Sequence, residues 1–382
     1  MFPILLCCFL MIILYPMGID LYLVAVPSMA ASLHTDPATL QGAFSAYLLA
    51  MAASVLPAGA LAERIGRRPL VLAGALLFAI ASLVAANATA LGPLLIARAL
   101  QGCAAGTLYV MTFTVLRDTL PASRLAAVLS VVNGVICVIP VLAPVLGFVL
   151  LAHWPWSSLF HTMALLGLLV FGVTALLLRE SRPAERSVQR RGWSPFLRDP
   201  RFLRRGALTC GGMTAILTYV GNAPLLLMGE LGLSTGHYAA LTAAMALVSL
   251  ISAFATPWLL RRLGPAQVLA TAHGAFALAT LLLVQPAGTA LPLLMSVFTL
   301  TCIGFSISFG VAMGEALAPC HHQAALASAT LCIAQIAGSG AFIWLATLAG
   351  ITPAGQLGLA LLMAVLLYLA TRRLPVLIPE ES

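Results

Sequence analysis

The sequence predicts an all-α polytopic membrane protein with about twelve spans. Hydrophobic residues make up 62% of the 382 positions and charged residues only 8%, whereas a soluble domain is about half apolar and about a quarter charged. Polar interruptions recur roughly every 30 residues, which is one bilayer crossing of ~20 residues plus a short connection. Lipid offers no hydrogen-bond partner to free backbone groups, so we expect every crossing to be a helix.

Short connections that contain polar residues, Gly or Pro separate the expected spans. The first span has no charged segment before it and is longer than the apolar part of a signal peptide, so we expect it to remain uncleaved. The eight cysteines form no paired motif, and His321–His322 falls at an expected turn, so we expect no disulfide framework, metal site or cofactor. The spans are predicted at residues 4–27, 41–62, 70–87, 92–116, 126–151, 157–178, 207–229, 237–260, 267–284, 290–314, 324–348 and 354–371.

The arginines indicate which side of the membrane each connection faces, because short cytoplasmic loops concentrate positive charge. Of the 19 arginines, 18 follow even-numbered spans, and the connections after odd-numbered spans contain none. We therefore expect both termini in the cytoplasm. The net charge of +8 follows from this arrangement, and no segment is long enough for a folded basic domain, so we expect no nucleic-acid partner.

The chain contains no lysine. A P-loop needs a lysine to reach the nucleotide phosphates, and Schiff-base chemistry needs a lysine amine. Both are therefore excluded. We expect no ATP site in this chain, which leaves an ion gradient, a facilitated pathway or a partner subunit as the source of any transport energy.

A polar segment with nine arginines separates six expected spans from six. When the sequence is aligned with itself at an offset of about 198 residues, the loop at Arg64–Arg68 aligns with Arg261, Arg262 and Gly264. Such repeats are typical of transporters whose substrate site lies between two halves. We expect an N-terminal half at residues 1–178, a central cytoplasmic loop at 179–206, a C-terminal half at 207–372 and a cytoplasmic tail at 373–382.

The connection between spans 2 and 3 contains glycines, an acid and basic residues at fixed spacing. It reads Gly59-Ala-Leu-Ala-Glu63-Arg64-Ile-Gly66-Arg67-Arg68. This motif resembles the corresponding loop of the major facilitator superfamily, with Glu63 where Asp is commoner. Gly59 would let two helices approach closely, and the Glu63 carboxylate would accept from an arginine or a helix N-terminus. We expect a conformational latch on the cytoplasmic side; alternatively, these arginines only set the topology.

Span 4 contains an intramembrane arginine. Arg98, Gln101 and Tyr109 share one helix face, and Gly102 with Gly106 forms a small-xxx-small pair. The stretch resembles the fourth-helix motif of the same superfamily. An arginine within the membrane costs several kcal/mol unless it is paired or hydrated, so it predicts a functional site. The alternative is that Arg98 extends to the outer surface.

Asp20 in span 1 is the expected partner of Arg98. Both residues lie roughly 10 Å from the outer ends of their spans at a rise of ~1.5 Å per residue. The run from Tyr15 to Pro27, with Tyr22 after the acid, resembles the first helix of twelve-span drug:proton antiporters, particularly the subgroup associated with chloramphenicol resistance. This resemblance implies that Asp20 and Arg98 couple transport to protons. A purely structural ion pair is the alternative.

Span 5 contains two prolines four residues apart, Pro140 and Pro144, followed by Gly147. This stretch resembles the antiporter signature of that helix, although Ala143 and Phe148 stand where Gly is usual. Proline removes a main-chain donor and bends a helix. The resemblance implies antiport, and an ordinary proline kink is the alternative.

Together, these resemblances imply an exporter of the major facilitator superfamily in a bacterial inner membrane. It would exchange protons for small, largely apolar drugs, with amphenicols as the family-based example. We expect it to act as a monomer and not to be an enzyme. The alternatives are a proton-coupled uptake symporter for a metabolite and a membrane-bound enzyme or sensor. Glu315 is the next candidate for a proton carrier. The residues expected to line the substrate cavity, unless they only bond neighbouring helices, are Tyr22, Gln101, Tyr109, Asn222 and Gln335.

The arginine distribution predicts a labelling pattern in intact cells. In a protein depleted of native cysteines, Ser32→Cys, Asn87→Cys and Thr352→Cys should react with an impermeant thiol reagent added outside. Ser123→Cys and Ser187→Cys should react only after lysis. Labelling of the last two variants in intact cells would contradict the orientation.

Overall fold

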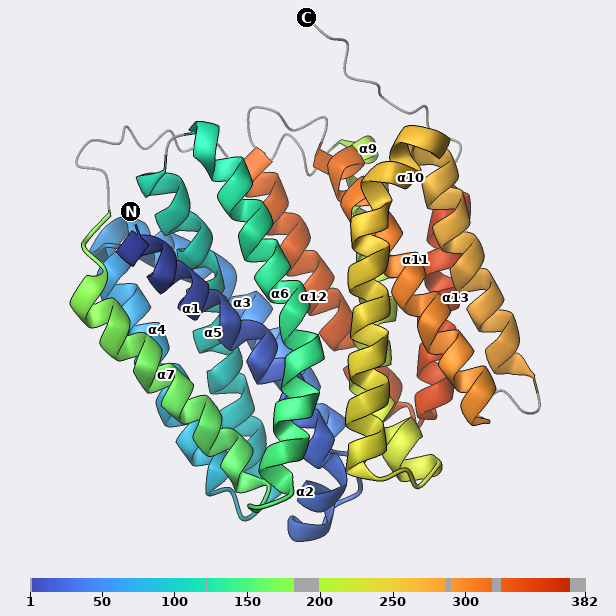
Figure 1. The fold of residues 1–382 in the computed structure, drawn as a ribbon, viewed down its shortest axis with the longest axis horizontal. Coiled ribbons are helices and arrows are strands. Elements are labelled where there is room, and N and C mark those ends of the chain that lie inside the picture. Colours follow the sequence, from blue (N-terminus) through green and yellow to red (C-terminus); the bar gives the residue numbers. More distant parts are fainter. Residues whose placement is uncertain (1, 121, 182–198, 286–289, 318–323, 372–382) are drawn as a thin grey trace, which may run out of the picture. The chain divides into compact units, whose positions relative to one another are not determined.

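The computed structural model describes residues 2–120, 122–181, 199–285, 290–317 and 324–371 (Figure 1). Within these residues, the regular secondary structure is entirely helical. The chain divides into two compact units. Unit 1 comprises Met1–Val188 and Leu233–Ala243, and unit 2 comprises Gln189–Gly232 and Ala244–Ser382. His321 and His322 lie outside the described residues.

Unit 1 is built around α5, which packs against α1, α3 and α4. The buried stripe of α5 includes Ala97, Gly102, Ala105 and Gly106, and such small residues let the main chains of neighbouring helices approach closely. The helices of this unit are α1 (Phe2–Asp20), the 3₁₀ helix η1 (Leu23–Ala25), α2 (Val26–Ser32), α3 (Gln41–Ile65), α4 (Arg67–Ala86), α5 (Leu91–Thr119), α6 (Ala122–Leu151) and α7 (Ser157–Leu177).

Unit 2 is built around α9, which packs against α11, α12 and α13. The α10 helix starts in the short segment of unit 1 and continues through unit 2. The remaining elements are α9 (Pro200–Pro224), the π-helix η2 (Leu225–Glu230), α10 (Thr235–Val284), α11 (Leu291–Leu317), α12 (Ala324–Leu348) and α13 (Pro353–Thr371).

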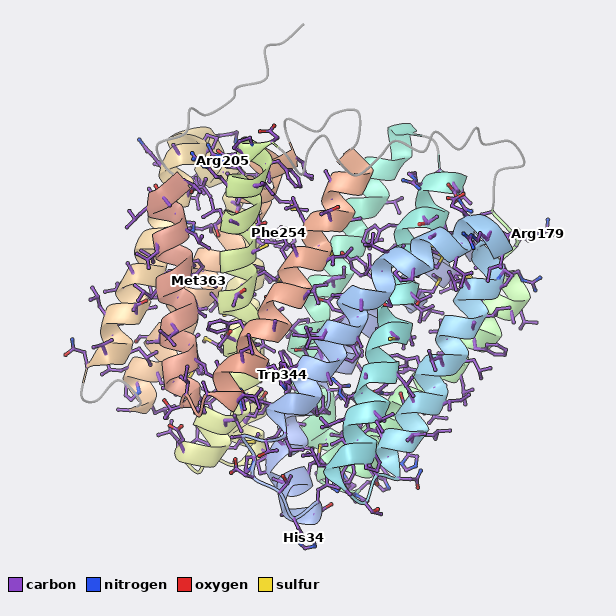
Figure 2. The ribbon with its side chains drawn as sticks, turned by 180° about the vertical axis from the view of Figure 1, so that it is seen from behind. His34, Arg179, Arg205, Phe254, Trp344 and Met363 are labelled. Carbon is purple, nitrogen blue, oxygen red and sulfur yellow. The ribbon has the colours of Figure 1, made fainter. Side chains whose placement is uncertain are left out.

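The predicted spans fall on these helices to within a few residues. In the described part of the chain, 10 helices are long and apolar enough to cross a membrane. One of them, α10, contains two predicted spans, and α6 contains a shorter apolar helix at Val138–Leu151. Large apolar side chains such as Phe254 and Trp344 project from the surface (Figure 2), where a soluble protein would expose polar groups. The predicted all-α membrane fold is confirmed.

Two glycines show that the predicted repeat extends to the backbone. Gly66, at the end of α3, has φ 99° and ψ 167°, and Gly264, inside α10, has φ 76° and ψ 164°. These positive φ angles favour glycine because a side chain would be strained there. The two residues are 198 positions apart in the sequence. The same turn therefore occurs at equivalent positions of the repeat.

The first span is not the continuous helix that the sequence predicts. The α1 helix ends at Asp20, and a turn at Leu21–Tyr22 leads into η1 and then α2. Pro27 lies in the first turn of α2, where its missing N–H interrupts no helical hydrogen bond but prevents a regular helix from continuing through it. The break places Asp20 at a helix end.

The close contact at Gly102 predicts that a larger residue there destabilises the protein. A Cβ on Gly102 would overlap the carbonyl oxygen of Tyr47 on α3, whereas a Cβ on Gly172 of α7 would meet no atom within 4 Å. Gly102→Ala should therefore destabilise the protein by about 1–3 kcal/mol, the usual effect of overpacking, and lower its melting temperature in detergent. Gly172→Ala is the control. Equal melting temperatures for Gly102→Ala and the parent would contradict this packing.

Candidate site around Asp20 and Arg98

Asp20 is the last residue of α1, and the break that follows it is packed tightly. Only 8% of Asp20 is exposed. Gly147 of α6 lies against the break: a Cβ there would come within 2.6 Å of Val24 Cγ1 and 2.9 Å of the Leu21 carbonyl oxygen. Glycine is therefore needed for α6 to approach the irregular segment.

Pro140 and Pro144 both lie inside α6. Because Pro144 has no N–H, the carbonyl of Pro140 loses its helical hydrogen bond. This irregular part of α6 leads directly to Gly147. The structure thus joins the prolines and glycine of the span 5 motif to the break beside Asp20, a connection that the spacing of the motif alone did not predict.

Arg98 is completely buried, so the alternative that it reaches the outer surface is wrong. Its Nη1 donates to Gln101 Oε1 at 2.8 Å, and its Nε donates to the Ala43 carbonyl at 3.4 Å. Its guanidinium carbon lies 4.3 Å from the ring centroid of Tyr22 and 4.4 Å from that of Tyr47. Cation–π contacts are strongest when the cation is removed from water.

The predicted ion pair between Asp20 and Arg98 is absent from this structure. Among the ion pairs and hydrogen bonds of the described residues, none joins the two side chains. The tyrosine rings and the Gln101 oxygen stabilise the cation instead, and Nη2 of Arg98 is buried without a hydrogen-bond partner in the described structure. Both ionisable side chains are buried, but they do not form a pair.

Gln101 links Arg98 to a second helix. Its Nε2 donates to Ser82 Oγ at 2.7 Å, and Ser82 donates to the Phe78 carbonyl of α4 at 2.6 Å. Both Gln101 and Ser82 are completely buried. The structure therefore places Gln101, predicted to line the cavity, in a network that orients Arg98.

Tyr109 lies on the same face of α5 as Arg98, in an aromatic cluster. Its ring centroid is 5.6 Å from that of Tyr15 and 4.9 Å from that of Phe113, with edge-to-face geometry in both pairs. Tyr22, also predicted to line the cavity, is buried against Arg98. Unit 1 thus brings together three predicted residues, Tyr22, Arg98 and Gln101, and places Tyr109 against α1.

The polar residues predicted to line the cavity in unit 2 make interhelical contacts. Asn222 of α9 donates to Gln356 of α13 at 3.2 Å, and Gln335 of α12 contacts the sulfur of Met313 at 3.7 Å. Both Asn222 and Gln335 are buried. These contacts agree with the alternative that such residues bond neighbouring helices.

Glu315, the second candidate for a proton carrier, forms an ion pair with Arg205. Arg205 lies in the first turns of α9 (Figure 2) and Glu315 lies near the end of α11. One carboxylate oxygen of Glu315 is buried without a hydrogen-bond partner among the described residues. Glu315 therefore already has a cationic partner within unit 2.

Arg67 is the centre of the motif between α3 and α4. Its side chain is completely buried: Nη2 pairs with Glu63 at 2.9 Å, Nε pairs with Asp118 at 2.9 Å, and Nη1 donates to the Ala62 carbonyl at 3.0 Å. One planar guanidinium thus bonds three acceptors, a geometry that lysine cannot reproduce. Glu63 thus accepts from an arginine four residues away in the same motif.

Glu180 closes the same cluster from the end of α7. Its two oxygens accept from the main-chain N–H groups of Arg67 at 2.9 Å and Arg68 at 3.2 Å. A carboxylate at a helix N-terminus satisfies free N–H groups and the helix dipole, so Glu180 caps α4. Asp118 and Glu180 were missed as site residues, although each is an acid that directly follows an arginine at the end of a predicted span.

Gly59, Gly66, Arg64 and Arg68 have different roles in the motif. The close approach predicted at Gly59 is absent, because a Cβ there would meet no atom within 4 Å. The positive φ of Gly66 turns the chain between α3 and α4, and Arg68 donates to the Ala175 carbonyl at 2.8 Å. Arg64 is exposed. The close contact of α3 occurs instead at Gly102 and Gly106 of α5.

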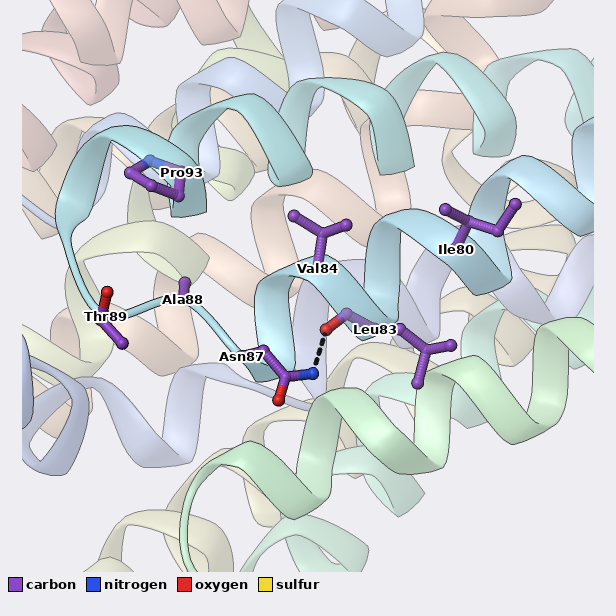
Figure 3. Close-up of a pocket in the computed structure, with 7 residues that line it drawn as sticks. All are labelled: Ile80, Leu83, Val84, Asn87, Ala88, Thr89 and Pro93. Carbon is purple, nitrogen blue, oxygen red and sulfur yellow. Dashed lines mark hydrogen bonds between the residues drawn. The ribbon is translucent and has the colours of Figure 1, made fainter.

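A surface groove lies where α4 ends and α5 begins (Figure 3). Its volume is about 430 Å³, and Ile80, Leu83, Val84 and Pro93 supply its apolar lining. Asn87 at one end donates to the Leu83 carbonyl at 2.8 Å. None of the predicted site residues lines this groove, so it is separate from the candidate coupling site.

The Arg67 cluster predicts a strong difference between arginine and lysine. Arg67→Lys keeps the charge but leaves at least one of its three acceptors unbonded, and an unsatisfied buried acceptor costs about 1–3 kcal/mol. The melting temperature in detergent should fall clearly. Arg64→Lys, at an exposed position of the same loop, should change it little. The cluster would have no special role if both variants melted with the parent.

Comparison with known proteins agrees with this architecture. The chain is 42% identical to multidrug resistance protein MdtL of Shewanella oneidensis over 100% of its length and 99% of the relative. It is 44% identical to MdtL of Escherichia coli O81, over 91% of this chain and 89% of the relative. The resemblance to multidrug exporters is thereby confirmed.

Solved structures show the same fold at low sequence identity. The xylose transporter XylE from E. coli, in a partially occluded inward-open conformation, matches with a TM-score of 0.76 at 14% identity and 98% coverage of both chains. A bacterial homolog of the human lysosomal transporter Spinster matches with a TM-score of 0.73 at 15% identity, covering 96% of this chain and 94% of that chain. The family model of the Major Facilitator Superfamily matches residues 8–343. The chain therefore belongs to the major facilitator superfamily.

Proposed function

We propose that this protein exports small, largely apolar drugs in exchange for protons by alternating access. The observation that carries the proposal is the buried carboxyl group of Asp20 at the end of α1, without an ion-pair partner in the described structure, while Tyr22, two residues later, packs against the buried Arg98. Relatives named multidrug resistance proteins, similar over nearly the whole chain, support drugs as the substrate class.

A buried carboxyl group can be stabilised by a cationic partner or by binding a proton, and the proposed proton exchange alternates between these two states. A carboxylate in an apolar interior is unstable unless it is paired or takes up a proton. Asp20 has no cationic partner within ion-pair distance in the described structure, while Tyr22, two residues later, contacts Arg98. In the proposed cycle, Asp20 binds a proton where Arg98 is held elsewhere and releases it where the two side chains meet.

The charge of the site favours a class of drugs. One carboxyl group and one guanidinium leave little net charge among the described side chains around the break in α1. Neutral or singly charged compounds are therefore better substrates than dications, and an amphenicol is the proposed test compound. Tyr22 and Tyr109, with their aromatic faces, would contact such a compound in unit 1.

The Arg67 cluster is the proposed latch on the cytoplasmic side. Glu63 and Asp118 hold Arg67, and Glu180 caps α4, so the loop between α3 and α4 is a rigid unit. A rigid loop can transmit a movement of α3 to α4. The proposed setting is a bacterial inner membrane, with both termini in the cytoplasm and the monomer as the transporting form.

Asp20→Asn tests the coupling. An amide cannot exchange a proton, so Asp20→Asn should fold and bind substrate but lose proton-driven export. Arg98→Ala should be at least as harmful, because it removes the cation that stabilises the carboxylate. The measurement is chloramphenicol transport in proteoliposomes under an imposed pH gradient, which also shows whether an inward proton gradient expels or accumulates the drug.

The exposed Asp36, on the connection after α2, provides a matched control. Asp36→Asn makes the same chemical change and should leave export at the parental rate. If Asp20→Asn concentrated the drug as well as the parent does, Asp20 would be a structural residue. Glu315→Gln would then be the variant expected to lose coupling.

A further inference from the structure

Tyr47 of α3 connects the two elements that carry the candidate coupling residues. It is completely buried, and its hydroxyl donates to the Tyr15 carbonyl of α1 at 2.9 Å. Its ring centroid lies 4.4 Å from the guanidinium carbon of Arg98 on α5. Tyr47 therefore contacts α1 through its hydroxyl and Arg98 through its ring.

The surroundings of Tyr47 leave it little freedom to move. A Cβ on Gly18 would come within 2.6 Å of the Tyr47 hydroxyl oxygen, and a Cβ on Gly102 would overlap the Tyr47 carbonyl oxygen. Glycine at both positions lets α1 and α5 close around this residue. The ring thus has a fixed position against which Arg98 is placed.

Arg98 has few other contacts that stabilise its charge. Gln101 and the Ala43 carbonyl each accept one hydrogen bond, and Nη2 is buried without a partner in the described structure. The electron-rich faces of Tyr22 and Tyr47 are therefore a main source of stabilisation for the cation. They compete with any carboxylate that approaches Arg98.

We propose that Tyr47 is a positioning residue of the coupling site, which holds Arg98 in the orientation that leaves Asp20 free to bind a proton. This inference rests on the proposed proton exchange at Asp20. The ring stabilises the unpaired cation, and the hydroxyl ties the ring to α1, so that a movement of α1 changes the position of Arg98. Proton uptake by Asp20 and release of Arg98 from the carboxylate then occur together.

The ionisable groups within electrostatic range of this arrangement are few. Tyr47 interacts with Tyr15, Asp20, Tyr22 and Arg98, and Tyr238, in the part of α10 that belongs to unit 1, interacts with Asp20 and Tyr22. Among these, Asp20 is the only carboxyl group. A pH-dependent signal from an acid at this site can therefore be assigned to it.

The test measures proton binding without a substrate. Dicyclohexylcarbodiimide reacts with protonated buried carboxyl groups, so labelling of the Asp20 peptide in the purified full-length protein, quantified by mass spectrometry across pH, reports its protonation. Tyr47→Leu removes the ring that competes with Asp20 for Arg98. The half-labelling pH should fall by about one unit, which corresponds to a tenfold change in the protonation equilibrium.

Three variants make the result specific. Tyr47→Phe keeps the ring and should have the parental half-labelling pH. Phe44→Leu removes a buried ring from the same helix and should also leave the half-labelling pH unchanged. Tyr22→Leu removes the second ring and should shift the half-labelling pH in the same direction as Tyr47→Leu, which keeps the test valid if Tyr47→Leu does not fold.

Other outcomes would overturn the inference. These are an unchanged half-labelling pH in the folded leucine variants, an equal shift in Phe44→Leu, or an Asp20 that is never labelled. Drug transport by the same preparations tests the proposed function separately. If Asp20→Asn loses export while Tyr47→Leu keeps the parental labelling curve, the coupling role of Asp20 stands and the positioning role of Tyr47 fails.

Discussion

The burial of the Arg98 charge is the constraint on which much of unit 1 depends. A guanidinium in an apolar membrane interior needs acceptors or aromatic faces, since water is not at hand to solvate it. The structure supplies them from three helices: Tyr22 beside the end of α1, the Ala43 carbonyl and Tyr47 of α3, and Gln101 of α5 itself. Stabilising one charge therefore fixes how these helices meet.

Close helix approach is the second requirement, and small residues satisfy it. Gly102 and Gly106 let α5 contact the main chain of α3, and Gly147 lets α6 contact the break after Asp20. These contacts involve the same segments that carry Tyr22 and Tyr47, whose rings pack against the guanidinium. Packing and electrostatics are thus not separate contributions here, because the same glycines that allow dense packing bring the aromatic rings to the cation.

The motif between α3 and α4 also buries an arginine, but it stabilises the charge with ion pairs. Arg67 is as buried as Arg98 but is bonded by Glu63, Asp118 and a main-chain carbonyl. This difference separates two kinds of site. Arg67 has acidic partners that hold it in one arrangement, as suits a rigid loop. Arg98 has no acidic partner in the described structure, and the proposed transport cycle requires it to change partners.

The membrane fold can be predicted from the amino-acid sequence, and so can the recurrence of one glycine turn. Whether a segment spans a bilayer depends on its own length and polarity, so the predicted spans match the helices closely. The need for positive φ at Gly66 and Gly264 is also local, and it is visible as a motif that recurs after 198 residues. Both features depend on residues that are close together in the sequence, so they can be predicted without the tertiary structure.

Which side chains contact one another depends on how the helices pack. Equal depth in the membrane predicted a pair between Asp20 and Arg98. In the structure, α1 ends at Asp20, and the guanidinium of Arg98 packs against Tyr22 and Tyr47 instead. Tyr47 could not be identified beforehand, because a tyrosine inside an apolar span has no distinctive spacing. Contacts such as that between Arg67 and Asp118 join residues 51 positions apart, and such long-range contacts depend on how the helices pack, which no single span encodes.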